Sequence, residues 1–327
     1  AISTLIVSIC YLIPQMVGAG ALVTPLLGMP HFLGVCVVGG IVIFIVATAG
    51  MTSTTYVQFL KGGLLIAFST ILTVMVLSKA LNKPPRPKYH NFLTLDAAVV
   101  DGRVVSVADD GWRVSGQQQA DGKTFVKVSD GTYNTWWTLA DENGQPVLRE
   151  ALSITQTAGG ETLYNGAPKE HRHSYQVGHM SEIVVNGESV NATGPVGPFE
   201  FLRLVEEGTV VTFPEATLTE AGNNVTIYYQ KPTAGSKLLR PGAGKFKIDA
   251  GATAMQKLDF VSLMLALFFG TAALPHVLIR YYTVPSSKDA RKSTIVAIAA
   301  IGFFYVLTIY MGVGAMVNGV VDVESSN

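Results

Sequence analysis

Residues 1–60 read AISTLIVSICYLIPQMVGAGALVTPLLGMPHFLGVCVVGGIVIFIVATAGMTSTTYVQFL, and this stretch contains no Asp, Glu, Lys or Arg. The same absence of charge returns at residues 260–279 and 293–321. A charged side chain at the centre of a bilayer costs about 2.5–3.5 kcal/mol on insertion scales, so uncharged runs of about 20 residues are typical of membrane-spanning helices. These runs predict a membrane protein.

The charged residues are concentrated in the middle of the chain. Of the 23 Lys and Arg residues, 17 lie within residues 83–257 and six lie outside this range. The two cysteines, Cys10 and Cys36, both fall in apolar runs, where a thiol behaves as a small hydrophobic group. The composition therefore predicts a multi-pass α-helical membrane protein with a polar insert, and it indicates no disulfide framework.

Five spanning helices are predicted, three before the insert and two after it. Turn signals separate them at Gly28-Met29-Pro30 and Met51-Thr52-Ser53, and Asp289 is the expected N-cap of the last helix. The predicted helices are residues 1–27, 31–50, 54–81, 258–281 and 289–319. The expected organisation is three helices in residues 1–82, the insert in residues 83–255, and two helices in residues 256–327.

The insert has the sequence pattern of an all-β domain. It opens with the proline-rich stretch 83–87, for which we expect an extended tether. Six Asp-Gly or Asn-Gly pairs favour hairpin turns between β-branched runs such as 104–107, 125–128 and 225–229. The pairs begin at Asp101, Asp121, Asp130, Asn143, Asn165 and Asn186. The aromatic residues expected in the core or at an interface are Trp112, Trp136, Trp137 and Phe213.

The basic residues give the expected orientation. Four of them lie in the short loop at residues 280–292, and this loop is predicted to be cytoplasmic. Four more lie at residues 79–88, but they lead into a long domain, and long domains are translocated largely regardless of charge. We therefore expect the insert to be extracytoplasmic.

The sequence Phe269-Gly-Thr-Ala-Ala-Leu-Pro-His276 interrupts the fourth predicted span. Pro275 removes a backbone donor and clashes with the preceding turn, so the helix is expected to unwind or kink there. An unwound stretch would present a helix N-terminus to a carboxylate and free carbonyl groups to a cation. A packing kink without a site is an equally weighted alternative, since Gly and Pro are common in membrane helices.

Several motifs resemble the sodium:solute symporter family, and most closely its cation/acetate branch. The first is GTAALPH at 270–276, followed by RYYTV at 280–284 and ARKS at 290–293. The others are QMVGAGAL at 15–22 and GMTSTTYVQ at 50–58. The insert is similar to that of actinobacterial monocarboxylate members of this branch.

The resemblance implies that the five spans are the third to seventh helices of a ten-helix inverted-repeat transporter core. The fourth span would be the discontinuous substrate-binding helix. The family's main sodium site uses the first and eighth core helices, so we expect these residues to be part of a longer transporter and assign no metal ligands. Gln58 stands where several sodium/sugar members have an Asp, which favours coupling to one cation, sodium or proton.

Other polar residues are weaker candidates. Tyr11 and Gln15 share a helical face and are expected either to line the cavity or to hydrogen-bond a neighbouring helix. His276 is expected near the substrate, or satisfied by local carbonyl groups. The histidines at 171, 173 and 179 have no acidic or cysteine partner in a recognised pattern, which favours a solvated loop over a metal site. No nucleophile-elbow, phosphate-loop or dinucleotide motif is present, so no enzyme is predicted. No nucleic-acid partner is expected either.

The resemblance and the motif together predict a secondary active symporter of the plasma membrane. It would couple cation entry to uptake of a small monocarboxylate such as acetate, pyruvate or propionate, with no cofactor besides the coupling ion. Its partners would be this substrate, membrane lipid and the remaining helices of the transporter. The alternative is a membrane-anchored extracytoplasmic sensing or partner-binding module. The predicted substrate-binding residues are Gly270, Thr271, Ala272, Leu274, Pro275, His276, Tyr11 and Gln15.

Overall fold

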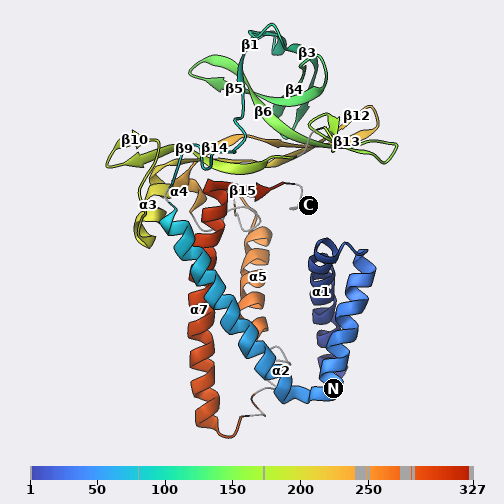
Figure 1. The fold of residues 1–327 in the computed structure, drawn as a ribbon, viewed down its shortest axis with the longest axis vertical. Coiled ribbons are helices and arrows are strands. Elements are labelled where there is room, and N and C mark those ends of the chain that lie inside the picture. The colour runs from blue at the N-terminus through green and yellow to red at the C-terminus, as the bar shows by residue number, and fades with distance from the viewer. Residues whose placement is uncertain are drawn as a thin grey trace. The chain divides into compact units, whose positions relative to one another are not determined.

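The computed structural model describes residues 2–79, 81–171, 174–239, 248, 251–272, 281 and 284–323. The chain forms two compact units (Figure 1). The first unit comprises Ala1–Ile71 and Gly242–Leu307 and contains most of the apolar helices. The second comprises Leu72–Pro241 and Thr308–Asn327, and it holds the insert together with the ends of two helices.

Helices α1 (Ile2–Leu27) and α2 (His31–Ser78) begin the first unit. Gly28, with φ +63°, allows the tight reversal between them, a backbone conformation that glycine adopts without strain. The two helices approach closely, because a Cβ added at Gly20 would lie 2.5 Å from Cγ2 of Val35. A hydrogen bond of 3.3 Å also joins Nε2 of His31 to the carbonyl oxygen of Val17. Small residues permit this packing, as in other membrane helices.

The turn expected at Met51-Thr52-Ser53 is absent, because α2 keeps a helical backbone from His31 to Ser78. The ribbon instead changes direction sharply within this helix (Figure 1). None of these three residues is proline, so no backbone donor is lost and the helix bends without ending. Two stretches of α2, His31–Thr48 and Thr55–Ser78, are each long and apolar enough to cross a membrane.

Four such stretches occur among the described residues, the other two being Leu5–Thr24 and Ser287–Val317. The remaining predicted span, 258–281, begins as helix α5 (Ala254–Ala272). Thr253 caps this helix, since its hydroxyl accepts a hydrogen bond from the backbone N–H of Gln256 at 3.3 Å. Most of the span beyond Ala272 lies outside the described residues.

Helix α7 (Ser287–Val317) differs from the prediction at both ends. Its N-cap is Ser286, whose hydroxyl accepts from the backbone N–H of Asp289 at 3.2 Å and donates to Oδ2 of Asp289 at 2.6 Å. Asp289 therefore lies in the first turn. At the other end the helix stops before Gly319, which has φ +63°, and the chain continues as strand β15 (Asn318–Asp322).

The larger sheet of the insert has ten strands, with the order β12-β13-β6-β5-β4-β3 along its main path. Strands β1 and β7 also pair with β6, while β2 pairs with β1 and β8 with β7. Their bounds are β1 Thr94–Val100, β2 Arg103–Val107, β3 Arg113–Ala120, β4 Lys123–Ser129, β5 Asn134–Glu142, β6 Gln145–Gln156, β7 Thr162–Tyr164, β8 Ala167–Pro168, β12 Glu215–Glu220 and β13 Asn223–Tyr229. Five of the six expected turn pairs have positive φ at both residues, as type I′ hairpins require.

The second sheet has the order β10-β9-β11-β14, and β15 also pairs with β9. Its strands are β9 Gln176–Val185, β10 Glu188–Val190, β11 Thr209–Thr212 and β14 Lys231–Ala234. The insert is not purely β, because it contains helices α3 (Pro198–Glu207) and α4 (Gly235–Leu238). Pro198 occupies the first turn of α3, where its missing N–H has no intrahelical partner to lose.

The four predicted core aromatics all pack against other apolar residues of the insert. Trp136 and Trp137 are buried, and Trp112 packs edge-on against Trp137 with ring centroids 5.3 Å apart. Phe213 packs against Phe92 at 4.9 Å. The large apolar area of these rings stabilises the insert.

The expected extended tether at residues 83–87 is instead a series of bends. Pro85 is buried, and a Cβ added at Gly319 would lie 3.1 Å from Cγ of Pro85 and 2.5 Å from the ring of Tyr89. The segment therefore packs against the start of β15, because its proline ring offers apolar surface that is better buried than exposed.

Candidate functional site

The predicted substrate motif begins at the C-terminal end of α5. Gly270, Thr271 and Ala272 have helical backbone there. Their side chains, and the whole of Leu274, Pro275 and His276, lie outside what the structure describes. The helix break remains a prediction.

Tyr11 and Gln15 lie one turn apart on α1 and share a face, as the spacing predicts. Both side chains are exposed, Tyr11 by 41%. The placement of this pair in the substrate site remains a prediction.

A groove lies between α2 and α7 in the described part of the first unit. Its volume is about 670 Å³, within the range of small-molecule pockets. The α2 wall comprises Gln58, Phe59, Gly62, Gly63, Leu65 and Ile66, and the α7 wall comprises Asp289, Lys292, Ser293, Val296, Ala297, Ala300, Ile301 and Phe304. Glycines and alanines leave the space between the two helices.

The lining of the groove is mostly apolar, and the polar residues on its α7 wall all come from the start of that helix. Asp289, Lys292 and Ser293 come from the first turns of α7, and Gln58 joins the lining from α2. Gln58 supplies a neutral carbonyl oxygen, which can assist cation binding but adds no charge. Sequence reasoning singled out Gln58 but missed the groove, because the pattern of one helix does not reveal which helix it packs against.

One residue of the RYYTV motif is fixed against α7. The hydroxyl of Tyr281 lies 2.9 Å from Oγ1 of Thr294, within hydrogen-bond distance. Thr294 in turn donates to the carbonyl oxygen of Ala290 at 2.8 Å. The loop before α7 is thereby tied to the first turns of this helix.

The predicted histidine group does not assemble as one site. His171 is exposed, His173 lies outside the described residues, and His179 is on β9. No group of three or more His, Cys, Asp or Glu residues that could hold a metal ion occurs within the described ranges.

His179 belongs to an aromatic cluster that the sequence did not indicate. Its Nδ1 lies 2.9 Å from the hydroxyl of Tyr89, and its ring centroid lies 5.3 Å from that of Tyr89. The pKa of His179 is lowered to about 4, mainly by burial and also by the positive charge of Lys83. Burial also raises the pKa of the Tyr89 hydroxyl. The pair is therefore neutral at pH 7 and serves packing.

A second contact fastens the segment after Tyr89 to the larger sheet. Nε2 of His90 lies 3.0 Å from Oε1 of Glu150, and the imidazole stacks on the ring of Tyr175 at 3.8 Å with an interplanar angle of 2°. The other carboxylate oxygen of Glu150 accepts from the backbone N–H of Leu93 at 2.9 Å. These contacts hold the connection between α2 and β1 in place.

Apolar helices long enough to span a bilayer, a groove between two of them and a large β insert are the features of a multi-pass membrane transporter. The chain belongs to the sodium:solute symporter family, whose model matches residues 1–82 and 210–322. This is a family of transporters and not of enzymes.

Two relatives extend this comparison. The chain is 30% identical over 319 residues to the monocarboxylic acid transporter of Corynebacterium glutamicum. This alignment covers 96% of this chain and 34% of that protein. It is 44% identical over 93 residues to the uncharacterized symporter YwcA of Bacillus subtilis, covering 28% of this chain and 16% of that protein. The chain thus spans about a third of the length of the Corynebacterium relative. No solved structure matches it significantly.

The family model and the alignment with the Corynebacterium relative differ in how much of the insert they include. The family model leaves out residues 83–209, which hold strands β1 to β10 and helix α3. The alignment with the Corynebacterium protein covers 96% of the chain and so includes most of this region. Residues 83–209 are therefore an addition to the sequence that the family model describes, and the alignment with this relative includes most of them.

Proposed function

We propose that the protein is a secondary active symporter that couples entry of a cation to uptake of a small monocarboxylate such as acetate, pyruvate or propionate. The observation that carries this proposal is the alignment of nearly the whole chain with a relative named as a monocarboxylic acid transporter. Sodium is the first candidate for the coupling ion because of the family. The proposal concerns the whole transporter, of which these residues would form five helices of a ten-helix core.

The substrate site is proposed at the interrupted helix that begins with α5. A half-helix that starts after the GTAALPH motif would direct unpaired N–H groups and the positive end of its dipole at the substrate carboxylate. The hydroxyl of Thr271 is the proposed side-chain contact, and the small apolar residues beside it leave room for a short alkyl tail. Leu274, Pro275, His276, Tyr11 and Gln15 are the other proposed lining residues.

The insert is proposed to lie outside the cell. A cysteine at Val105, a residue on β2 that is 57% exposed, tests this placement in a background from which the native cysteines, Cys10 and Cys36 among them, have been removed. We expect a membrane-impermeant maleimide to label it in intact cells. Labelling only after the cells are lysed would reverse the proposed orientation.

Uptake by the purified full-length transporter tests the function. Proteoliposomes would receive labelled acetate with an inward sodium gradient, an inward proton gradient, or neither. We expect the sodium gradient to stimulate uptake, and pyruvate and propionate to compete where neutral acetamide does not. Stimulation only by protons would change the coupling ion, and absence of uptake under every condition would reject the monocarboxylate proposal.

A further inference from the structure

The loop before α3 is hydrogen-bonded to the end of a membrane span. The backbone N–H of Val196 donates to the carbonyl oxygen of Leu77 at 3.1 Å, and that of Thr193 donates to Leu81 at 2.9 Å. The hydroxyl of Thr193 also accepts from the backbone N–H of Leu81 at 2.9 Å. Leu77 belongs to the last turn of the apolar stretch that ends at Ser78. The loop therefore lies at the depth where this helix leaves the bilayer.

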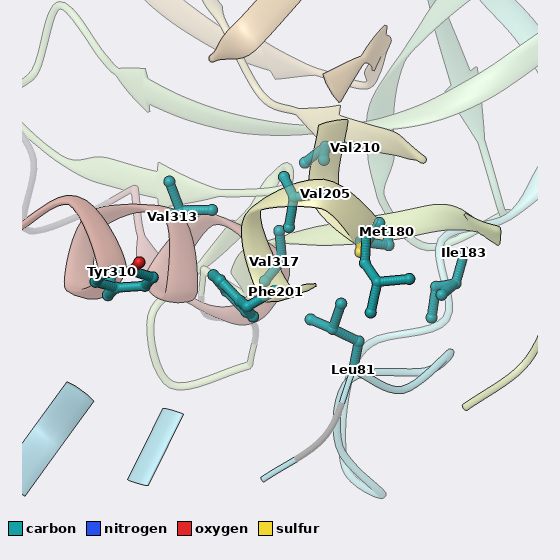
Figure 2. Packing of buried hydrophobic residues seen from close by; sticks show 10 residues of the cluster. Leu81, Met180, Ile183, Phe201, Val205, Val210, Tyr310, Val313 and Val317 are labelled. Carbon is teal, nitrogen blue, oxygen red and sulfur yellow. The ribbon is translucent and has the colours of Figure 1, made fainter. Parts of the chain in front are cut away.

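The packing of α3 against α7 independently places α3 at the same depth in the membrane. The buried face of α3, formed by Phe201, Leu204 and Val205, packs against the last turns of α7 (Figure 2). The rings of Phe201 and Tyr310 lie 6.2 Å apart, and Val313 and Val317 complete the contact. These α7 residues belong to the apolar stretch that ends at Val317.

The opposite side of α3 carries an aromatic side chain, Phe199, that is largely exposed. Phe199 is 85% exposed, whereas Leu202, one turn further, is partly buried against the apolar cluster. Lys79, the first charged residue after the α2 span, is also exposed. A single exposed aromatic residue on a soluble domain would need no explanation. Phe199, however, lies where two membrane spans end. Amphipathic and aromatic groups contact lipid at this membrane–water interface.

The charges on α3 are compatible with such a contact. Glu200, next to Phe199, has its carboxylate 4.0 Å from the guanidinium of Arg203. Glu206 and Glu207 lie in the last turn, away from Phe199 along the helix. The end of α3 that carries the exposed ring thus has its one carboxylate near a cation.

We propose that the loop 194–197 and the first turns of α3 form a membrane-interface anchor of the insert. The ring of Phe199 lies between the lipid headgroups and the acyl chains, and the ammonium of Lys79 lies among the lipid phosphates. The insert is thereby held against the bilayer surface as well as against the ends of α2 and α7. The partner is lipid, and the inference does not depend on which solute is transported.

Spin labels on the full-length protein test the anchor. In a background in which the native cysteines, Cys10 and Cys36 among them, are replaced by serine, one variant carries the label at Phe199→Cys. The control carries it at Val105→Cys, an exposed apolar site on β2. Both are reconstituted in vesicles of phosphatidylethanolamine and phosphatidylglycerol. We expect oxygen to collide with the label at 199 more often than a polar nickel chelate does, and the reverse at 105.

Two outcomes would overturn the proposal. A label at 199 with the aqueous behaviour of the control would place the ring in water. A label that neither reagent reaches would show that another part of the protein covers it. Both substitutions replace exposed side chains, so the fold is expected to tolerate them.

Discussion

Gly178 lies on β9 where this strand passes the end of α7. Its φ is +92°, and a Cβ added there would lie 2.5 Å from the carbonyl oxygen of Met316. Gly178→Ala therefore adds two costs, about 1–2 kcal/mol for the left-handed backbone and about 1–3 kcal/mol for overpacking. We expect the strand to move away from Met316 and to weaken its pairing with β15, which joins Val177 to Val321.

Gly187→Ala is the matched control. Gly187 has φ +85°, but no heavy atom lies within 4 Å of its added Cβ. It carries the backbone cost without the overpacking. The expected difference between the two variants is therefore about 1–3 kcal/mol, which is about a 5- to 150-fold difference in an opening equilibrium.

Hydrogen exchange followed by mass spectrometry measures this opening peptide by peptide. In Gly178→Ala, we expect amides of β15 and the start of β9 to exchange at least about 5-fold faster than in Gly187→Ala. A peptide from β13, which pairs in the larger sheet, is expected to be unchanged in both. Equal exchange of β15 in the two variants would show that the insert is not fixed to the end of α7 by this contact.

Three further predictions concern acid stability, coupling and substrate binding. Because the unfolded chain protonates His179 near pH 6.5 and the folded insert does so only near pH 4, stability is retained above 6.5 and falls as the pH drops toward 4, by on the order of 3 kcal/mol. Thermal unfolding of wild type and His179→Asn checks this, and equal acid sensitivity would contradict it. Gln58→Ala is expected to leave the cation-to-acetate ratio unchanged, since a neutral amide adds no charge; parallel fluxes of labelled sodium and acetate measure this, and a changed ratio would contradict single-cation coupling. Thr271→Val is expected to raise the KM for acetate about 2- to 12-fold through loss of one hydrogen bond, while Thr271→Ser retains it; unchanged uptake kinetics in the valine variant would exclude the hydroxyl contact.

The hairpins of the insert could be predicted because their turn chemistry is local. Asp101 and Asn165, each before a glycine, adopt φ +50°, which Asp and Asn tolerate better than other side chains. The turn at Ala221-Gly222 was missed, since alanine rarely adopts the φ of +50° that it has here. Local preference therefore gave most of the turns but not all of them.

Strand β15 could not be predicted from its own residues. Asn318–Val321 continues the uncharged run of α7, so hydropathy alone extends the helix through it. Its strand conformation depends on pairing with β9, which is distant in sequence. Helix α3 was missed for a related reason, because strand signals dominate the residues on both sides of it.

The candidate site, like the fold, could be predicted from the sequence only in part. Residue type predicted the apolar spans and the face shared by Tyr11 and Gln15. The groove between α2 and α7 depends on which helices meet, and an isolated helical pattern does not contain that information. The interrupted helix is predicted from the chemistry of Pro275, which lies outside the described residues.

Solute counterflow tests the central claim most directly, because it needs no assumption about the coupling ion. Proteoliposomes of the full-length transporter would be loaded with unlabelled acetate, pyruvate or acetamide and diluted into a trace of labelled acetate, with equal sodium on both sides. We predict transient accumulation of label with the two carboxylates and none with acetamide. Absence of accumulation with every load, in protein whose insert is folded, would contradict transport of a small monocarboxylate.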